Sequence, residues 1–401
     1  TALGYFALVS NTTASSNTAV GYQAGYSNTT GGPNSFFGNL AGYSNTTGSA
    51  NTATGNQALN ANVIGNYNAA FGDRALRLAT GSNNTAVGAL SSYNVSTGAN
   101  NTAVGSEALF TNTTAGNNTA VGTQSMYLNT TGASNTGIGI YALFGNTTGN
   151  NNTALGQSAL QSNTTASNNT AVGFQALITS TTAANNTAVG YQAGHLNTTG
   201  DLNVFVGNEA GLSNTTSSSN TAVGSAALRS NTTSVSNSAF GRAVSYSNTT
   251  GGRNSAFGGP ADTNIATFQS NTTGSYNSAF GHGALALNST ASGNTAVGYN
   301  SLYTNSTGTQ NTAVGYQAAY LISTATNITA IGYQAAANAT GDATLAIGTS
   351  AAFATTGVDN VAIGSAALLT NSSGANNVAL GRSALRFSTT ASNNTALGFQ
   401  T

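Results

Sequence analysis

Carboxylates and histidines are the groups from which a catalytic or metal site is usually built, and this chain has few of them. Its 401 residues include seven acids, two histidines and no cysteine. Glu107 and Glu209 share a repeat position but lie six repeats apart, about 29 Å at the ~4.8 Å spacing of parallel strands. Hydrolysis by a carboxylate pair needs groups within about 10 Å. The other acids also lie on separate repeats: Asp73, Asp201, Asp262, Asp342 and Asp359.

The histidines give no better site. His195 and His282 occupy different repeat positions, five repeats apart, with no carboxylate cluster beside either. We expect both to be exposed surface residues. The glycines do not form a phosphate-binding loop, since no G-K-[ST] or G-x-G-x-x-G motif joins a strand to a helix. A calcium-binding nonapeptide array needs an aspartate in every repeat, and that is missing. The sequence therefore predicts no enzyme activity, no cofactor and no metal site.

Asparagine is the residue type with the most chemical content, because N-x-[ST] motifs recur along the chain in two registers. The first register lies in an S-N-T-T-G segment and supplies candidate glycosylation sites: Asn11, Asn28, Asn45, Asn112, Asn129, Asn146, Asn163, Asn197, Asn214, Asn231, Asn248 and Asn271. The second register includes Asn83, Asn117, Asn151 and Asn168. Two interpretations stay open, glycan attachment and turn formation, because Asn and Thr also favour tight turns. Glycans on every repeat would crowd at a spacing below ~5 Å, and Thr12 and Thr13 are alternative O-linked sites.

These motifs recur because the whole chain is a tandem repeat. Numbered from its first Asn, the unit reads N-T-A-V-G-Y-Q-A-L-x-S-N-T-T-G-x-N, and its fifth residue is a glycine. That glycine recurs in 24 units, nearly always 17 residues apart, with three intervals of 16 and one of 23. Disordered low-complexity tracts do not keep phase in this way, so the periodicity indicates a repeat architecture.

The pattern within the unit predicts strands rather than helices. Glycine and β-branched residues are frequent, and no apolar stripe follows helical spacing. Position 4 is apolar in all units except at Thr54, and position 2 is sometimes Val or Leu. Because side chains alternate along a strand, we expect positions 2 and 4 to face inward together. Position 6 varies among polar and charged residues, which indicates solvent exposure. Position 8 is usually Ala, which indicates close approach of another strand layer or another chain.

The predicted fold is all-β, a parallel β-solenoid (β-roll) of about 24 coils of ~17 residues. Each coil would hold two short strands, a corner at the position-5 glycine and a longer turn at S-N-T-T-G-x-N. Candidate structural corners are Gly21, Gly38, Gly105, Gly173, Gly190 and Gly298. We expect residues 1–401 to form one continuous array. Both ends fall inside a repeat, so we expect a segment of a longer array. Six extra residues near 259–269, beginning Gly259-Pro260, predict a loop.

The composition limits the partners. Only 3% of residues are charged and the formal net charge is zero. The chain therefore lacks the basic surface that would predict nucleic-acid binding. No apolar run approaches the ~18 residues of a membrane span. Each coil buries few apolar side chains, so its stability must come from stacking on its neighbours, in part through ladders of stacked Asn side chains. A thin core and an uncharged surface favour further burial against identical chains, or a covering of glycans.

The repeat also resembles a known family. N-x-A-[VI]-G, as in Asn360-Val361-Ala362-Ile363-Gly364, resembles the head repeats of YadA-like trimeric autotransporter adhesins. The N-T-A-V-G-Y-Q-A-L arrays are also similar to bacterial surface proteins and phage tail-fibre shafts. The resemblance spans the chain and implies a left-handed β-roll, three chains side by side and an extracellular attachment role. Those heads have a shorter repeat without the S-N-T-T-G turn, and no binding residues carry over.

We therefore expect a non-catalytic subunit of an extracellular or cell-surface fibre, filament or shaft, or of a virion fibre. Its partners would be identical chains, as a trimer or an end-to-end filament, with glycans as covalent additions. An adhesin head that binds a host or surface ligand is the alternative. An ice-binding solenoid is a third interpretation, which needs flat T-x-T strands, whereas position 4 here is apolar and expected to face inward.

Overall fold

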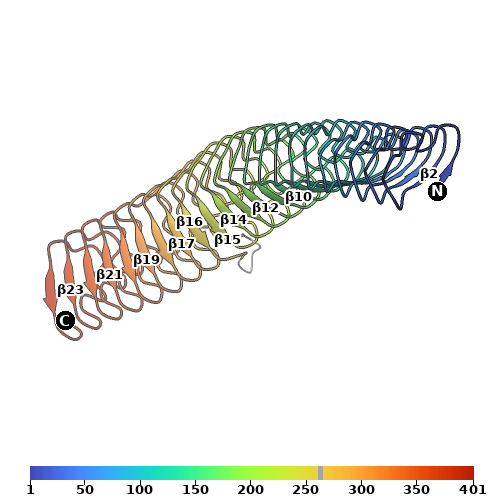
Figure 1. Cartoon of the computed structure of the whole chain (residues 1–401). Coiled ribbons are helices and arrows are strands. Elements are labelled where there is room, and N and C mark those ends of the chain that lie inside the picture. The colour runs from blue at the N-terminus through green and yellow to red at the C-terminus, as the bar shows by residue number, and fades with distance from the viewer. Residues whose placement is uncertain (261–264) are drawn as a thin grey trace. The chain divides into compact units, whose positions relative to one another are not determined.

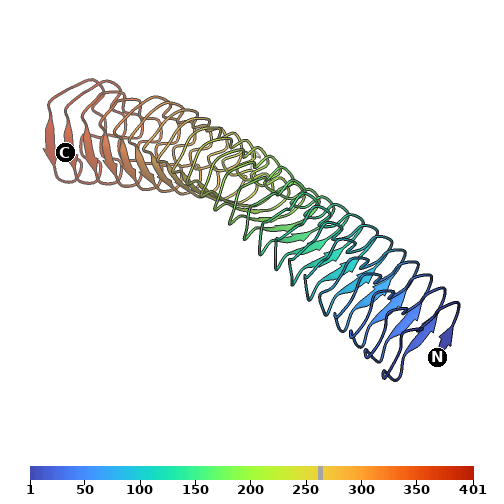
Figure 2. The ribbon, with the colours of Figure 1, turned by 45° about the horizontal axis from the view of Figure 1, so that its top comes forward.

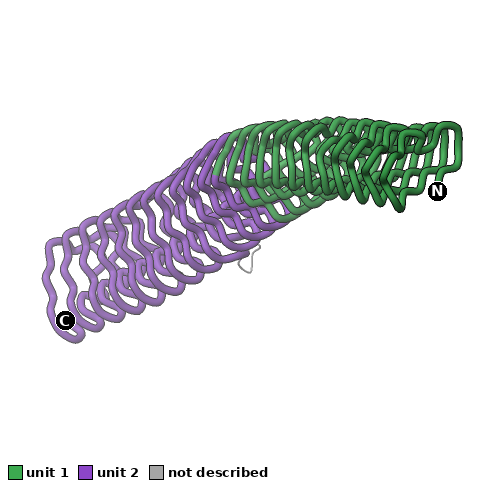
Figure 3. The backbone as a smooth tube through the Cα atoms, viewed as in Figure 1, with its two compact units in different colours: residues 1–201 green, residues 202–401 purple. Residues whose placement is uncertain are grey.

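The computed structural model describes residues 1–260 and 265–401. Over these residues the chain is all-β, with 24 short parallel strands, one in each repeat, and no helix (Figure 1). The chain forms two compact units, residues 1–201 and residues 202–401 (Figure 3). Within each unit successive coils stack so that their strands lie side by side (Figure 2). The predicted parallel β-solenoid of ~17-residue repeats is confirmed.

Each strand covers positions 2 to 4 of its repeat, except the first, which covers positions 3 and 4. In the first unit the strands are β1 (Ala2–Leu3), β2 (Thr18–Val20), β3 (Ser35–Phe37), β4 (Thr52–Thr54), β5 (Ala69–Phe71), β6 (Thr85–Val87), β7 (Thr102–Val104), β8 (Thr119–Val121), β9 (Thr136–Ile138), β10 (Thr153–Leu155), β11 (Thr170–Val172) and β12 (Thr187–Val189). In the second unit they are β13 (Val204–Val206), β14 (Thr221–Val223), β15 (Ser238–Phe240), β16 (Ser255–Phe257), β17 (Ser278–Phe280), β18 (Thr295–Val297), β19 (Thr312–Val314), β20 (Thr329–Ile331), β21 (Leu345–Ile347), β22 (Val361–Ile363), β23 (Val378–Leu380) and β24 (Thr395–Leu397).

The pairing register places equivalent repeat positions one above the other. Thr102 pairs with Thr119, 17 residues later. The shorter and longer repeats keep the same alignment, because Phe71 pairs with Val87 and Phe257 pairs with Phe280. Length differences are therefore absorbed outside the strand.

The second strand expected in each coil is absent from the described residues. Positions 6 to 11 form turns instead, because positions 7 and 9 adopt the left-handed conformation, as in Gln124 (φ 54°) and Leu109 (φ 56°). Such residues interrupt an extended strand. Their amides still bond to neighbouring coils: Leu109 N donates to Ser125 O at 2.9 Å, and Gln124 N to Ser106 O at 3.0 Å. This segment therefore contributes to stacking without forming a regular strand.

The expected inward face of the strand is wrong. Position 3 is the buried residue, as in Ala103, and positions 2 and 4, Thr102 and Val104, are only partly covered. The alternation was correct but its phase was reversed. Space explains the reversal: the interior between the strand and the position 6–11 turns usually admits only a methyl group, so the larger apolar side chain points outward.

Alanine at position 8 and leucine at position 9 complete the core. Ala108 and Leu109 are fully buried, so the small residue at position 8 reflects packing inside the coil, and it no longer argues for a neighbouring chain. A larger core side chain at one position is compensated by smaller residues at the positions packed against it. Phe36 replaces Ala at position 3, and glycine replaces Leu at position 9 on either side, where a Cβ added at Gly25 or Gly42 would lie 2.8 or 2.4 Å from the Phe36 ring.

The loop expected near residues 259–269 lies partly outside the described residues, which omit 261–264. On its described flanks, Pro260 and Ala266 form an isolated bridge. Beyond the insertion Phe268 occupies the core position of the coil and is fully buried. The extra residues thus leave the stacking of the coil on both sides intact.

Candidate functional site

The turn asparagines at position 12 form a buried ladder along the stack. In the run from Asn112 to Asn163, each Nδ2 donates to Oδ1 of the equivalent Asn one coil earlier, at 2.9, 2.7 and 2.7 Å. The same Nδ2 also donates within its own turn, as from Asn146 to Gly149 O at 3.0 Å. Asn112, Asn129, Asn146 and Asn163 are fully buried. The side chain therefore connects coils and closes its own turn at once.

The leading asparagines at position 1 form a second buried ladder beside the first. Here the backbone N–H of one Asn donates to Oδ1 of the preceding one, from Asn34 to Asn17 at 2.7 Å and from Asn51 to Asn34 at 2.9 Å. The Nδ2 group donates across to the next turn, from Asn34 to Gly48 O at 2.9 Å. The expected ladder at this position is present, whereas its buried partner at position 12 was not predicted.

The rest of the N-T-T-G turn is also fixed by stacking. Position 13 threonines donate Oγ1–H to the carbonyl one coil later, as from Thr130 to Thr147 O at 2.9 Å. At position 15, a Cβ added to Gly149 would lie 2.1 Å from Ala166 O. A real Cβ never approaches a carbonyl oxygen this closely, so the turn of this coil would have to shift to accept a side chain. Other coils do carry a small side chain at this position, as at Ala115, Ala166 and Ser217, and keep the same turn hydrogen bond. Packing thus explains the repeated Asn and Thr and favours a small residue at position 15.

The candidate glycosylation sites sit on this ladder. Asn28, Asn45, Asn112, Asn129, Asn146, Asn163, Asn197, Asn214, Asn231, Asn248 and Asn271 are all buried, and Asn11 is half-buried. An N-linked glycan would occupy Nδ2, which already makes hydrogen bonds in the ladder. A bulky, solvated sugar requires the surface. In the folded coil these asparagines therefore serve the stack and offer no free amide to a glycan.

The second register of sequons lies at position 17 and is exposed. Asn83, Asn117, Asn151 and Asn168 are open to solvent and have φ between 56 and 62°. Asparagine tolerates this left-handed conformation better than other non-glycine residues. Backbone conformation is therefore a sufficient reason for Asn at this position.

The position-5 glycines lie directly after the strands, where the chain turns. Their φ values are between 129 and 139° at Gly21, Gly38, Gly105, Gly173, Gly190 and Gly298. Side-chain-bearing residues rarely adopt such angles. At Gly173 an added Cβ would also lie 2.3 Å from Gly190 O. Both backbone angle and stacking distance thus require glycine at this corner.

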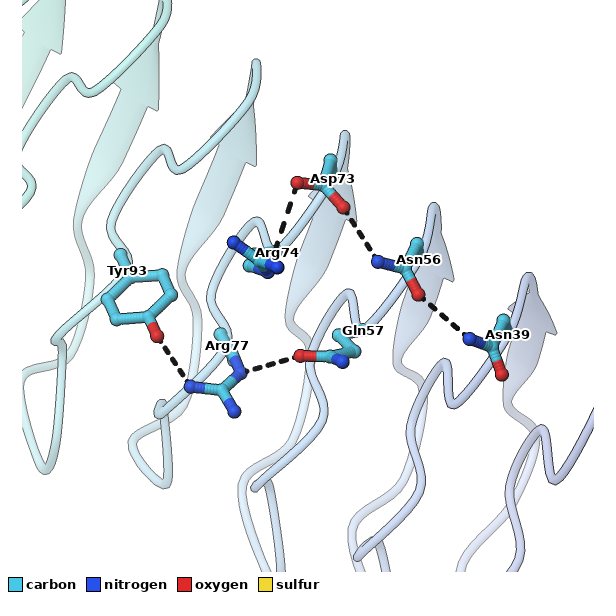
Figure 4. A network of polar contacts seen from close by, with 7 residues as sticks. All are labelled: Asn39, Asn56, Gln57, Asp73, Arg74, Arg77 and Tyr93. Atoms are coloured by element: carbon cyan, nitrogen blue, oxygen red, sulfur yellow. Dashed lines mark hydrogen bonds and ion pairs between the residues drawn. The ribbon is translucent and has the colours of Figure 1, made fainter.

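The acidic residues are dispersed over the surface, and several extend ladders of polar side chains. Asn39 donates to Asn56 Oδ1 at 3.0 Å, and Asn56 donates to Asp73 Oδ1 at 2.9 Å (Figure 4). Asp201 and Asp342 accept backbone N–H groups one coil earlier at 2.6 and 2.8 Å. Asp262 lies outside the described residues. Asp342 and Asp359 are on neighbouring coils, where Asp359 N donates to Asp342 O at 3.1 Å.

Two arginine clusters occupy equivalent places in the two units. Arg77 Nε donates to Gln57 Oε1 at 2.9 Å, and its guanidinium also bonds the Tyr93 hydroxyl (Figure 4). In the second unit Arg229 Nε lies 2.7 Å from Glu209 Oε2, and Nη1 donates to the Tyr246 hydroxyl at 3.2 Å.

The second cluster is an ion pair. The hydrogen bond to Glu209 raises the pKa of Arg229 above its ordinary value, desolvation opposes this, and Tyr246 adds to it. Because guanidinium is already charged at neutral pH, this geometry stabilises a cation without creating a proton-transfer group. The arrangement connects three successive coils and has no visible catalytic partner.

The histidines differ in environment. His282 is exposed as expected, with Nδ1 3.2 Å from Pro260 O. His195 is half-buried, and its Nδ1 is buried without a hydrogen-bond partner among the described residues. The expectation of two exposed histidines is therefore wrong for His195, because its ring lies along the surface at position 10 and is partly covered.

Aromatic residues form stacks along the coils. At position 10, Tyr93, Phe110, Tyr127 and Phe144 stack with centroid separations of 5.3, 5.1 and 5.4 Å. Such pairs contribute about 0.5–1.5 kcal/mol each beyond burial. The neighbouring rings occupy one another's faces and leave mainly ring edges and hydroxyl groups to solvent. The stacks therefore strengthen the array and offer little ring face on which a sugar could pack.

The outward sheet face, defined as the side chains at positions 2 and 4, carries Thr or Ser beside a larger apolar residue. Val87, Ile138 and Val297 on this face are 37–39% exposed. The expectation that position 4 faces inward, which argued against ice binding, is therefore wrong. Of the strands, β4 alone reads T-x-T; the others carry an apolar residue at position 4, and Phe71 and Phe280 interrupt the flat surface.

Across the described residues, no group of three or more His, Cys, Asp or Glu side chains is placed to hold a metal ion. A membrane-spanning helix is likewise not found in that part of the chain. A scan against protein-family models found no match, and a search of curated proteins found none either.

Proposed function

We propose that this protein is a non-catalytic structural subunit of an extracellular fibre, filament or shaft, which assembles with identical chains. The observation that carries the proposal is the continuity of bonding between coils. Strand amides, turn amides, two rows of buried Asn and the position-13 hydroxyl groups all connect one coil to the next. Such an array resists separation of its coils along the stacking direction, which is what a load-bearing fibre needs.

The polar groups support a structural role over an enzymatic one. Asp73, Asp201 and Asp342 accept hydrogen bonds from neighbouring coils, and Glu209 pairs with Arg229. These acids complete the stacking of the solenoid instead of converging on a cleft. A general acid and base must both reach one substrate, and apart from Asp342 and Asp359, which lie on neighbouring coils, the described carboxylates are dispersed.

An adhesin head is the second candidate, and the exposed tyrosines favour it. Tyr316 and Tyr333 stack at 5.2 Å and are 44% and 51% exposed. Tyrosine combines apolar area with a hydroxyl group at low entropic cost, which suits protein recognition. A ligand of this row would be a protein surface rather than a sugar, because the ring faces are already stacked.

Sedimentation velocity and negative-stain electron microscopy of the 401-residue chain test the proposal. We expect concentration-dependent association and ordered multi-chain particles. A chain that stays monomeric and dispersed at all concentrations, without glycans, would contradict the structural role and favour a stand-alone binding solenoid.

A further inference from the structure

A serine interrupts the buried row of position-12 asparagines in the first unit. Ser180 stands between Asn163 and Asn197 in this row, and its side chain is fully buried. Its turn keeps the backbone hydrogen bond of the neighbouring turns, because Ser180 N donates to Leu177 O at 3.1 Å. The equivalent bond from Asn163 N is also 3.1 Å long. The interruption is therefore confined to the side chain.

Two polar atoms at this interruption are buried without a hydrogen-bond partner among the described residues, Asn163 Oδ1 and Ser180 Oγ. In the unbroken row such an Oδ1 accepts from the next coil, as Asn146 Oδ1 accepts from Asn163 Nδ2 at 2.7 Å. Asn163 Oδ1 therefore faces the coil of Ser180, whose hydroxyl group does not bond to it. Leaving a buried acceptor and a buried hydroxyl unpaired is unfavourable, so both atoms call for a further partner.

Another end of the row shows how an Oδ1 is satisfied when no polar side chain follows it. Asn62 is followed in the row by Ala79, and its Oδ1 accepts from Gly65 N of its own turn at 3.0 Å. Asn163 Oδ1 makes no bond of this kind. It keeps the orientation that it would have in a continuing row, which points to a hydrogen-bond donor between the two coils.

The donor that the row lacks at this point is the amide Nδ2 of an asparagine. In the preceding coil that group donates twice, from Asn163 Nδ2 to Asn146 Oδ1 at 2.7 Å and to Ala166 O of its own turn at 3.1 Å. The equivalent acceptors at the interruption are Asn163 Oδ1 and Ala183 O. Serine has two non-hydrogen atoms fewer than asparagine, which leaves room for about one water molecule.

We propose that an internal water molecule binds between the coils of Asn163 and Ser180 and replaces the missing Nδ2. It donates one hydrogen to Asn163 Oδ1 and the other to Ala183 O, and it accepts from the Ser180 hydroxyl. Ala183 O also accepts from Asn169 Nδ2 at 2.8 Å, and a carbonyl oxygen has two lone pairs for these two bonds. About three hydrogen bonds are usual for a buried water. A metal cation fits less well, because Ca²⁺ takes six to eight oxygen ligands, carboxylates among them.

Ser180→Ala tests the site through the sign of its effect on amide hydrogen exchange. With water bound, the variant removes one of three partners, so exchange in the coils that contain residues 163–197 should become roughly two- to tenfold faster. Without water, the variant removes an unpaired buried hydroxyl, and exchange should slow. The matched control, Ser162→Ala, makes the same change at an exposed serine of the neighbouring coil and should leave exchange unchanged.

A crystal structure of the full-length chain at a resolution that shows ordered water identifies the ligand directly. We expect one density peak about 2.5–3.0 Å from Asn163 Oδ1, Ser180 Oγ and Ala183 O. The peak should be lost in Ser180→Asn, whose amide takes its place. Unchanged or slower exchange in Ser180→Ala would overturn the proposal, as would the absence of a peak between well-ordered Asn163 and Ser180 side chains.

Discussion

Replacing Asn146 by alanine tests whether the buried Asn ladder holds the coils together. Asn146 lies in the middle of an unbroken run, fully buried, and makes three side-chain hydrogen bonds. Its Nδ2 donates to Asn129 Oδ1 and Gly149 O, and its Oδ1 accepts from Asn163 at 2.7 Å. The substitution removes all three bonds. It leaves Asn129 Oδ1, Gly149 O and Asn163 Nδ2 each without the bond to Asn146 in the interior.

The magnitude follows from how those partners relax. A net hydrogen bond is worth about 0.5–1.5 kcal/mol, and a buried group left without a partner costs about 1–3 kcal/mol. Relaxation reduces the cost, as the ladder end at Asn62 shows: with Ala79 in the next coil, Asn62 Oδ1 accepts from Gly65 N at 3.0 Å. In the Asn129 turn the equivalent donor, Gly132 N, already bonds Thr147 O at 3.3 Å, so relaxation there recovers less. We therefore expect Asn146→Ala to destabilise its coils by about 2–4 kcal/mol.

Two companion variants isolate the cause. Asn39→Ala removes an exposed Asn that also bonds the equivalent Asn of the next coil, at 3.0 Å. Because water replaces that bond, the stability of its coils should fall by less than about 0.5 kcal/mol. Ser180→Asn repairs a natural break in the buried row, where Asn163 Oδ1 and Ser180 Oγ are buried without hydrogen-bond partners among the described residues. It should stabilise its coils by about 1 kcal/mol.

Hydrogen-exchange mass spectrometry of the full-length proteins is the assay, because long arrays do not unfold in two states and need a local readout. Faster exchange should centre on the coils that contain residues 129–163 in Asn146→Ala. Equal protection in Asn146→Ala and Asn39→Ala would refute the reasoning, since burial would then make no difference to the ladder.

Three further predictions concern packing, the corner and the ion pair. Phe36→Ala should lower the local free energy of opening, measured by hydrogen exchange in its coils, by about 3–5 kcal/mol. Adding Gly42→Leu should recover much of this loss by refilling the layer, and no recovery would contradict the compensation between the two positions. Gly173→Val should increase exchange in its own and adjacent coils, because both the φ of 135° and the 2.3 Å approach exclude a side chain; unchanged melting would rule out a required corner. Glu209→Gln should lower the free energy of unfolding by less than about 1 kcal/mol near neutral pH. The raised pKa of Arg229 keeps its guanidinium charged there, and the contribution of the ion pair is lost only as the pH rises through that pKa. A loss of several kcal/mol would show a larger role for the pair.

The period of the repeat made the solenoid and its register predictable. A glycine recurring every 17 residues requires equivalent residues to stack, and Thr102 does pair with Thr119. Which side chains of each strand point inward could not be predicted from the variation of residue types alone. Val104 is apolar, as a core residue would be, yet it points outward because Ala103 is all that the interior admits.

The burial of the turn asparagines was not predictable for a related reason. N-T-T-G is typical of exposed turns, so the sequence leaves Asn146 open to two interpretations, glycan attachment and turn formation. The available signal was the repetition itself: a turn that stacks on an identical turn at every coil can bury its polar atoms in a ladder. Conversely, Asn168 has a sequon of similar appearance and is exposed, with a left-handed backbone, φ 62°. The N-x-T motif alone could not distinguish the buried Asn146 from the exposed Asn168.

Cryo-electron microscopy of the 401-residue chain at concentrations where it associates tests the central claim most directly. We expect particles in which each chain shows a repeat of about 4.8 Å along its stack, and in which two or more identical chains pack together. Single dispersed solenoids at every concentration would contradict the proposed structural role.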